Sequence, residues 1–181
     1  TNLDWTIIRP SSLFGDPRGQ NRPEFCKALK EDMLELVPGF PSALPFPAPS
    51  FHEGLVPFGS GEFSFSMIHV KNVAEIILKI LEDKDSIGQT IELGGNKDFT
   101  WDEIIKTIAK ASNKKVIMVP APVLVVLTAA RFLDWWKKFP VTRDQLKDLI
   151  KGSVCNSEKI IKKYDIDLIP FNSENLSYLA S

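Results

Sequence analysis

The chain has few of the residues that build metal centres, disulfide frameworks or nucleic-acid interfaces. Its two cysteines, Cys26 and Cys155, are far apart, and neither they nor the two histidines have the spacing of a zinc site. Two such cysteines are typical of reduced thiols inside a cell, since a disulfide framework has a clearer pattern. The net charge of −1 gives no reason to expect a nucleic acid or an anionic membrane as partner. We therefore expect a cytoplasmic protein with no metal and no nucleic-acid partner.

Long apolar runs are also scarce. The longest extends from Val116 to Leu133, and two prolines and an arginine interrupt it. It is too short and too broken to span a membrane. Its second part, residues 123–132, is predicted to be a buried helix, with a helix on a membrane surface as the alternative. At 181 residues, of which 44% are hydrophobic, the chain is long enough for one domain with its own core.

The motifs of cofactor binding are missing as well. Gly59-Ser-Gly61 is the only G-x-G in the chain; it lacks the third glycine, and the strand predicted at Phe63 follows it. A dinucleotide fingerprint needs a strand, then the glycines, then a helix, so this motif is rejected. No phosphate-binding loop occurs in the sequence. His69 is interpreted as a core or cleft-wall residue, and no residue of this chain is predicted to be catalytic.

The stretch from Trp5 to Gly15 is the most informative part of the sequence. Its apolar run, Trp5 to Ile8, is rich in β-branched and aromatic residues, which predicts a strand buried on both faces. Pro10 cannot donate to a ladder and should end the strand. The serines at 11 and 12 then lie in a loop at its carboxyl end, where open parallel sheets bind ligands. Such a strand needs two neighbours, so we expect one from outside these 181 residues.

Hydrophobic periodicity and capping residues predict a mixed order of helices and strands along the rest of the chain. Beyond the first strand, further strands are expected at Phe63–Val70, Gln89–Gly94 and Val116–Val119. Helices are expected to begin at Pro23, Asn72, Thr100, Pro122, Thr142, Ser157 and Glu174. Thr100 and Glu103 have the spacing of a capping box, and Asn72 with Glu75 has a similar one.

The segment from Pro38 to Phe58 shows no period. It holds six prolines and four phenylalanines, and a structureless segment of this length is usually functional or disordered. One interpretation is an apolar lid over a substrate cleft. The other is a loop packed on the surface or at a subunit contact, and the sequence favours neither.

Several short motifs occur in a recognisable order. They are residues 5–11 (Trp-Thr-Ile-Ile-Arg-Pro-Ser), Phe14-Gly15, 68–74, 88–94 and 99–103. In this order they resemble the downstream half of the extended short-chain dehydrogenase/reductase superfamily. The similarity is to its NAD-dependent epimerase/dehydratase-like members. These include 3β-hydroxysteroid dehydrogenase-like proteins and the dehydrogenase-like accessory subunit of respiratory complex I.

This resemblance implies an α/β fold, with a partial NAD(P)-binding Rossmann sheet and a mixed α/β C-terminal substrate lobe. Residues 1–181 would form a single unit, with about 1–22 and 68–98 associated with the sheet and about 23–67 and 99–181 in the lobe. The cofactor, NAD or NADP, would have its nicotinamide end beside the loop residues Pro10, Ser11, Ser12 and Leu13. The substrate would contact four aromatic side chains and one imidazole: Phe14, Phe25, Phe58, Phe65 and His69.

The sequence departs from the family pattern in two respects. The family's glycine fingerprint and catalytic Tyr-x-x-x-Lys lie upstream of the first strand, and neither Tyr164 nor Tyr178 has a lysine four residues later. Hydride chemistry, which uses that tyrosine as general acid and base, would be incomplete here. Sugar-nucleotide epimerases carry Arg-Asp where Phe65-Ser66 stand, so a bidentate grip on a pyrophosphate is lost. We expect a small substrate that is apolar or of unknown kind rather than a nucleotide sugar.

Three functions follow as hypotheses. The leading one is the substrate-binding half of an NAD(P)-dependent oxidoreductase or epimerase-like enzyme, inactive by itself. Its partner would be the missing N-terminal half, or a second chain that covers the strand at residues 5–9; a homodimer is left open. The second is a non-catalytic dinucleotide-binding protein with a structural, assembly or regulatory role. A stand-alone interaction module is the third.

We expect the 181-residue chain to bind NAD(P) negligibly, because it lacks the helix N-terminus that cradles the cofactor's phosphates. Calorimetry with NAD and NADP tests this directly. Micromolar binding by the isolated chain would contradict the expectation.

Overall fold

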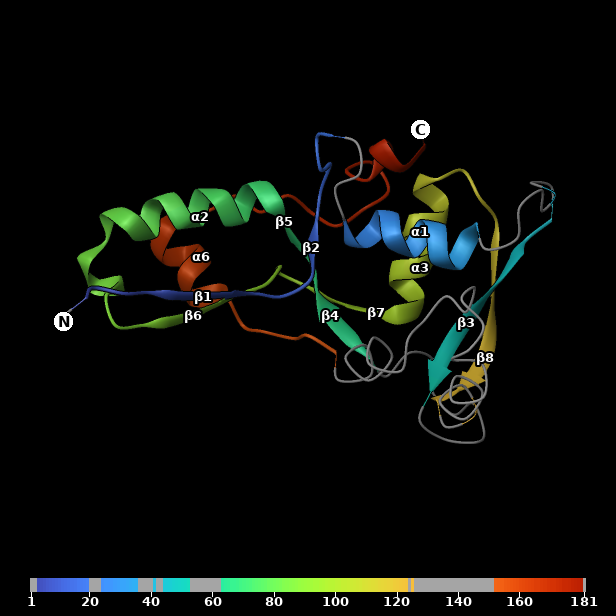
Figure 1. The fold of residues 1–181 in the computed structure, drawn as a ribbon, viewed down its shortest axis with the longest axis horizontal. Coiled ribbons are helices and arrows are strands. Elements are labelled where there is room, and N and C mark those ends of the chain that lie inside the picture. Colours follow the sequence, from blue (N-terminus) through green and yellow to red (C-terminus); the bar gives the residue numbers. More distant parts are fainter. Residues whose placement is uncertain are drawn as a thin grey trace.

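The computed structural model describes residues 3–19, 24–35, 41, 44–52, 63–123, 125 and 152–180. Phe58, the helix predicted from Thr142 and nearly all of the helix predicted from Pro122 lie outside these residues. The described elements form two bodies side by side along the longest axis of the molecule (Figure 1). Short strands near the middle join them.

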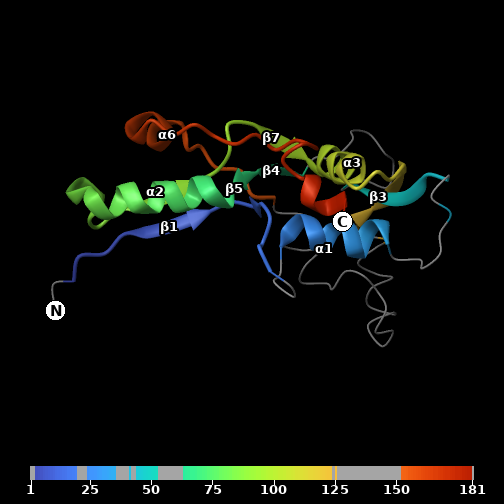
Figure 2. The same cartoon turned by 90° about the horizontal axis from the view of Figure 1, so that it is seen from above.

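The first body is built on a parallel pair of strands, β1 (Ile7–Pro10) and β6 (Thr90–Leu93). Helix α2 (Val70–Glu82), the short 3₁₀ helix η1 (Lys84–Ser86) and helix α6 (Glu158–Tyr164) complete it. Its core is aliphatic and consists of Ile68, Val73, Ile76, Ile80, Ile91, Leu93 and Ile166. Figure 2 shows β1 along the margin of this body, on the side opposite α6.

The first strand ends at Pro10 as the sequence predicts, but it begins at Ile7 rather than at Trp5. Its expected burial on both faces is wrong for this chain. Trp5 is 48% exposed and Ile7 is 45% exposed. The physical reason is that Trp5, Ile7 and Arg9 alternate onto one face, which the described elements leave exposed. Among the described strands β1 pairs only with β6. Its other edge therefore has no strand to cover it within that part of the chain.

Two short strand pairs lie in the middle of the molecule. Strand β2 (Leu13–Phe14) is parallel to β5 (Ile68–His69), and β4 (Ser64–Ser66) is antiparallel to β7 (Asp98–Thr100). Because β5 leads directly into α2, the first body and the middle strands share one continuous segment of chain.

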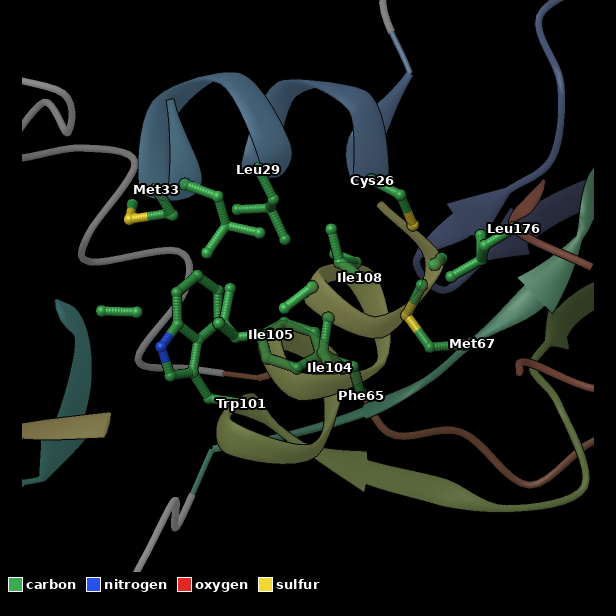
Figure 3. Packing of buried hydrophobic residues seen from close by; sticks show 14 of the residues in the cluster. Cys26, Leu29, Met33, Phe65, Met67, Trp101, Ile104, Ile105, Ile108 and Leu176 are labelled. Atoms are coloured by element: carbon green, nitrogen blue, oxygen red, sulfur yellow. The ribbon is translucent and has the colours of Figure 1, made fainter. Parts of the chain in front are cut away.

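The second body has a larger core between helices α1 (Phe25–Leu34) and α3 (Trp101–Ala111). The predicted capping box of Thr100 and Glu103 is present at the start of α3. Trp101, Ile104, Ile105 and Ile108 are fully buried, as their spacing predicts. Figure 3 shows these side chains pointing toward Leu29 and Met33 of α1.

The proline-rich segment contains a strand that the sequence did not indicate. Strand β3 (Phe46–His52) is parallel to β8 (Val116–Pro122). The amide of Phe46 donates to Lys115 O at 2.8 Å, so alternation turns the positions of Pro47 and Pro49 away from β8. A missing N–H costs nothing on that outer edge, which is why a strand tolerates these prolines.

Part of this segment is packed rather than lid-like. Phe46, Ala48 and Phe51 are buried, and the ring of Phe51 lies 5.4 Å from that of Trp101. The indole Nε1 of Trp101 donates to Pro49 O at 2.8 Å. These contacts fix residues 46–51 to the second body.

The start of α2 differs from the prediction. Its N-cap is His69, whose Nδ1 accepts from the Lys71 amide at 3.1 Å, and the predicted cap Asn72 lies within the helix. An imidazole nitrogen serves here as the acceptor that Asn, Asp or Ser more often supplies. Asn72 is instead buried; its Nδ2 donates to Asp167 O at 2.8 Å and its Oδ1 accepts from the Ile169 amide at 2.9 Å.

The last described segment, residues 152–180, runs along both bodies (Figure 1). Ser153 exchanges backbone hydrogen bonds with β4, through Ser64 O at 3.0 Å and the Ser66 amide at 2.8 Å. Helix α6 then packs in the first body, and the 3₁₀ helix η2 (Ser177–Ala180) brings Leu179 into the second core. The segment thus ties the two bodies together.

We expect Asn72→Ala to lower the free energy of unfolding by about 1–3 kcal/mol, because it leaves the buried partners Asp167 O and Ile169 N–H unpaired. Glu75→Ala, on the exposed side of the same helix, is the matched control and should change it by about 0.5 kcal/mol or less. Denaturant unfolding measures both. Equal effects would show that the Asn72 bridge does not hold the C-terminal segment.

Candidate functional site

The carboxyl ends of β2 and β5 lie together, and a cavity of about 920 Å³ opens beside them. Gly15 follows β2 and Val70 follows β5, and both line this cavity. Its other walls come from the start of α1 and from the segment before η2. The location agrees with the rule that open parallel sheets bind ligands beyond the carboxyl ends of their strands.

Gly15 allows the chain to pass close to the start of α2. Its φ is +136°, and a Cβ at this position would lie 2.9 Å from Val70 Cγ1 and 3.0 Å from His69 Nε2. A side chain here would be strained by both the backbone conformation and the contacts. The glycine therefore sets how closely the loop after β2 approaches the imidazole.

His69 forms the inner wall of the cavity. It is 7% exposed, and its ring lies edge-on to that of Phe14 with centroids 4.9 Å apart. Burial lowers the pKa of His69, and the neighbouring ammonium of Lys71 lowers it further. Because Nδ1 accepts a backbone N–H, the neutral ring carries its proton on Nε2.

Tyr178 and Glu24 form a second polar group at the cavity, with the buried Cys26 behind them. The amide of Gly15 donates to the Tyr178 hydroxyl at 3.3 Å, and the Glu24 carboxylate accepts from the amides of Cys26 and Lys27 at 3.0 and 2.6 Å. Burial, followed by the charge of Glu24, raises the pKa of the Cys26 thiol. Burial also raises the pKa of Tyr178, with Cys26 and Glu24 adding to the effect.

These shifts define the chemistry open to the group. A thiolate is the reactive form of cysteine, and Cys26 is held as a neutral, fully buried thiol. Tyr178 is held as a neutral phenol, which is the opposite of a tyrosine whose pKa is lowered for proton transfer. Both groups are therefore suited to hydrogen bonding rather than to nucleophilic attack.

The structure brings together part of the predicted site. Five of the nine predicted residues line the cavity: Ser11, Leu13, Phe14, Phe25 and His69. Pro10 ends β1 outside it, and the Ser12 carbonyl accepts from the Ile68 amide at 3.0 Å. Phe65 is buried against Phe25, with ring centroids 6.3 Å apart, and does not line the cavity.

The hydroxyl of Ser11 is already engaged. It donates to Ser153 O at 2.6 Å and lies 3.0 Å from Ser153 Oγ. The sequence left open whether this hydroxyl bonds a ligand or a loop backbone, and in this structure it bonds the backbone.

Other residues of the site were not predicted, among them Arg18, Glu24, Lys71 and Tyr178. Glu24 stands just before the first helix, which is a position where acidic side chains cap, so a local signal existed. Tyr178 lies 163 residues from Gly15 in the sequence, and no local sequence pattern predicts a contact between them.

We expect the stability of the chain to fall as the pH is lowered from about 6.5, the usual pKa of histidine, toward the lower pKa of folded His69. The unfolded chain binds the proton more readily there, so the stabilisation present above this range is lost. His69→Asn keeps a capping acceptor and should reduce the dependence of the free energy of unfolding on pH, measured by denaturant unfolding across this range. His52→Asn is the control and should keep the pH dependence of the parent. An equal loss of pH dependence in both variants would contradict the assignment of this effect to His69.

The comparisons with known proteins agree with this architecture. No protein-family model matches the chain. It is 28% identical over 174 residues to NADH dehydrogenase (ubiquinone) 1 alpha subcomplex subunit 9, a mitochondrial protein of Arabidopsis thaliana. That match covers 91% of this chain and 38% of the plant protein, so the chain spans well under half of this relative's length. No helix in the described part of the chain is long and apolar enough to cross a membrane.

Solved structures show the same fold. UDP-glucose 4-epimerase of Thermotoga maritima, solved with UDP-glucose, matches 98% of this chain and 45% of its own, with a TM-score of 0.57 and 14% identity. UDP-glucose 4-epimerase of Thermus thermophilus, solved with NAD, matches 98% of this chain and 46% of its own, with a TM-score of 0.58 and 18% identity. UDP-glucuronic acid 4-epimerase of Bacillus cereus, solved with UDP-glucuronic acid and NAD, matches 94% of this chain and 42% of its own, with a TM-score of 0.54 and 18% identity.

These findings confirm the resemblance and the fold class predicted from the sequence. The chain is similar to a mitochondrial NADH dehydrogenase subunit in sequence and to NAD-dependent epimerases in fold. It shares the α/β fold of these epimerases over less than half of their length.

Proposed function

We propose that the chain is the substrate-binding part of an NAD(P)-dependent oxidoreductase- or epimerase-like protein. The observation that carries the proposal is the position of the cavity, at the carboxyl ends of the parallel strands β2 and β5. The other parallel pair, β1 with β6, leaves one edge of β1 without a partner among the described strands. In open parallel sheets the cofactor and substrate meet at the carboxyl ends of the strands. The structural neighbours that hold NAD support the same assignment.

The open edge of β1 supports a partner for this chain. The amides of Ile7 and Ser11 donate to Gln89 O and Leu93 O of the β6 segment, at 2.9 and 2.7 Å. By alternation the Ile8 amide points to the opposite edge, where a second parallel strand would accept it. Leu78 and Leu81 of α2 are 64% and 77% exposed, which leaves apolar surface on the same body.

We assign this edge to an upstream part of the same protein, with a second chain or a homodimer contact as alternatives. The relatives are more than twice as long as the part that matches, so they contain chain that could supply such a strand. In the assembled protein Pro10, Ser11, Ser12 and Leu13 would lie beside the nicotinamide. Phe14, Phe25 and His69 would face a small, partly apolar substrate, with Phe65 behind Phe25 and Phe58 in a segment outside the described residues.

A non-catalytic role is the second candidate. The relative from Arabidopsis is named as a subunit of a larger, mitochondrial NADH dehydrogenase, which favours a structural or assembly role and a mitochondrial rather than cytoplasmic setting. The raised pKa of Tyr178 also makes this tyrosine a poor acid–base catalyst at neutral pH. The upstream sequence distinguishes the candidates: a glycine fingerprint with Tyr-x-x-x-Lys supports an enzyme, and the fingerprint alone supports the structural role.

We expect the longer protein that contains this chain to bind NADH or NADPH, and Leu13→Trp to weaken that binding about tenfold or more. Leu13 lines the cavity and is 37% exposed, so an indole there would occupy space beside the nicotinamide. Leu44→Trp, at a position 55% exposed and away from the cavity, should bind like the parent. Calorimetry measures the affinity of the parent and of both variants. A tenfold weaker affinity corresponds to a loss of about 1.4 kcal/mol of binding free energy.

Two outcomes would overturn the proposal. One is the absence of NADH and NADPH binding by the longer protein. The other is equal affinity of the Leu13→Trp and Leu44→Trp variants, which would place the nicotinamide away from the cavity.

A further inference from the structure

The N-terminus of α2 opens into the cavity. Residues His69, Val70 and Lys71, which are its cap and its first two positions, all line the cavity wall. The helix has 13 residues, and the first amides of a helix lack partners within it. These amides and the helix dipole together favour a negative charge at this end.

A second and independent feature is the Nε2–H of His69. The side chain is more than nine-tenths buried, and its Nδ1 is committed to the Lys71 amide, so Nε2 is a donor. Among the described residues no acceptor is hydrogen-bonded to Nε2. The atom lies at the Gly15 side of the cavity, 3.0 Å from the position a Gly15 Cβ would take. Because no acceptor among the described residues pairs with this donor, its partner in the cavity would come from a ligand or from water.

The charges around this donor come from several elements. Lys71 and Arg18 are the cations that line the cavity, and Lys71 is close enough to act on the pKa of His69. Three carboxylates also line it, but two have backbone partners: Asp16 accepts from the Arg18 amide at 2.9 Å, and Glu24 caps α1. Glu174 is exposed and lines the cavity as well. The cavity is thus mixed in charge, and among these groups Lys71 is the charge that acts on His69.

We propose that the end of the cavity formed by His69 Nε2–H, Lys71 and the first turn of α2 binds an oxyanion, the phosphate or carboxylate group of a small molecule. The rest of that molecule would extend toward the Tyr178 hydroxyl and Glu24. The site is formed by this chain alone, so its existence does not depend on dinucleotide binding by the longer protein.

The test uses the 181-residue chain and inorganic phosphate at constant ionic strength, set with sodium chloride. The chain has two histidines, so ¹⁵N-labelled histidine gives a simple NMR spectrum in which His52 is the internal reference. We expect a saturable shift of the His69 Nε2 resonance and none for His52. The same titration with acetate and with glycerol 3-phosphate identifies the preferred oxyanion, and the proposal holds whichever of the three binds most tightly.

Variants separate the contributions to the site. Lys71→Gln should weaken phosphate binding about twofold to fivefold, the size expected for one charge near a helix terminus. Lys106→Gln, the same change on the exposed side of α3, should leave it unaltered. His69→Asn keeps a capping acceptor but removes the Nε2 donor, and should abolish saturable phosphate binding measured by calorimetry.

The proposal is overturned if none of the three anions shifts His69 saturably, or if chloride produces the same shift. It is also overturned if Lys71→Gln and Lys106→Gln bind phosphate equally. Lys71→Gln changes an exposed side chain, so this comparison still decides the question should His69→Asn fail to fold.

Discussion

The parallel pairing of β1 with β6 is the interaction on which the rest of the structure depends. It brings residues 7–10 against residues 90–93, and the Ser11 amide extends the ladder to Leu93 O. The chain then passes directly to β2, whose partner β5 leads into α2. One ladder thus fixes the loop after β1, the cap of α2 and the cavity between them.

Close backbone contacts make this arrangement intolerant of side chains at the end of β6. A Cβ at Gly95 would overlap Met67 O, and one at Gly94 would lie 2.7 Å from both Cys155 Sγ and Ser66 Cβ. The glycine pair therefore lets β6, the turn between β4 and β5, and the segment at Cys155 meet. The Asn72 bridge to residues 167 and 169 joins the C-terminal segment to α2.

Local rules were sufficient where structure is set by neighbouring residues. The capping box of Thr100 and the buried stripe of α3 could be predicted because each depends on residues within three or four positions. Strand β3 could not, because its partner β8 is about seventy residues away and its prolines argue against a strand until the pairing edge is known. The rule that favours Asn as a cap also misplaced the start of α2, since it ranks His69 below Asn72.

The central proposal is that the outer edge of β1 pairs with a strand from another part of the longer protein that contains this chain. Amide hydrogen exchange at Ile8 tests it most directly, with Ile7, whose amide donates to Gln89 O, as the internal reference. The account requires Ile8 to exchange rapidly in the isolated chain and to become as protected as Ile7 in the longer protein. Rapid exchange at Ile8 in the longer protein, or full protection already in the isolated chain, would contradict it.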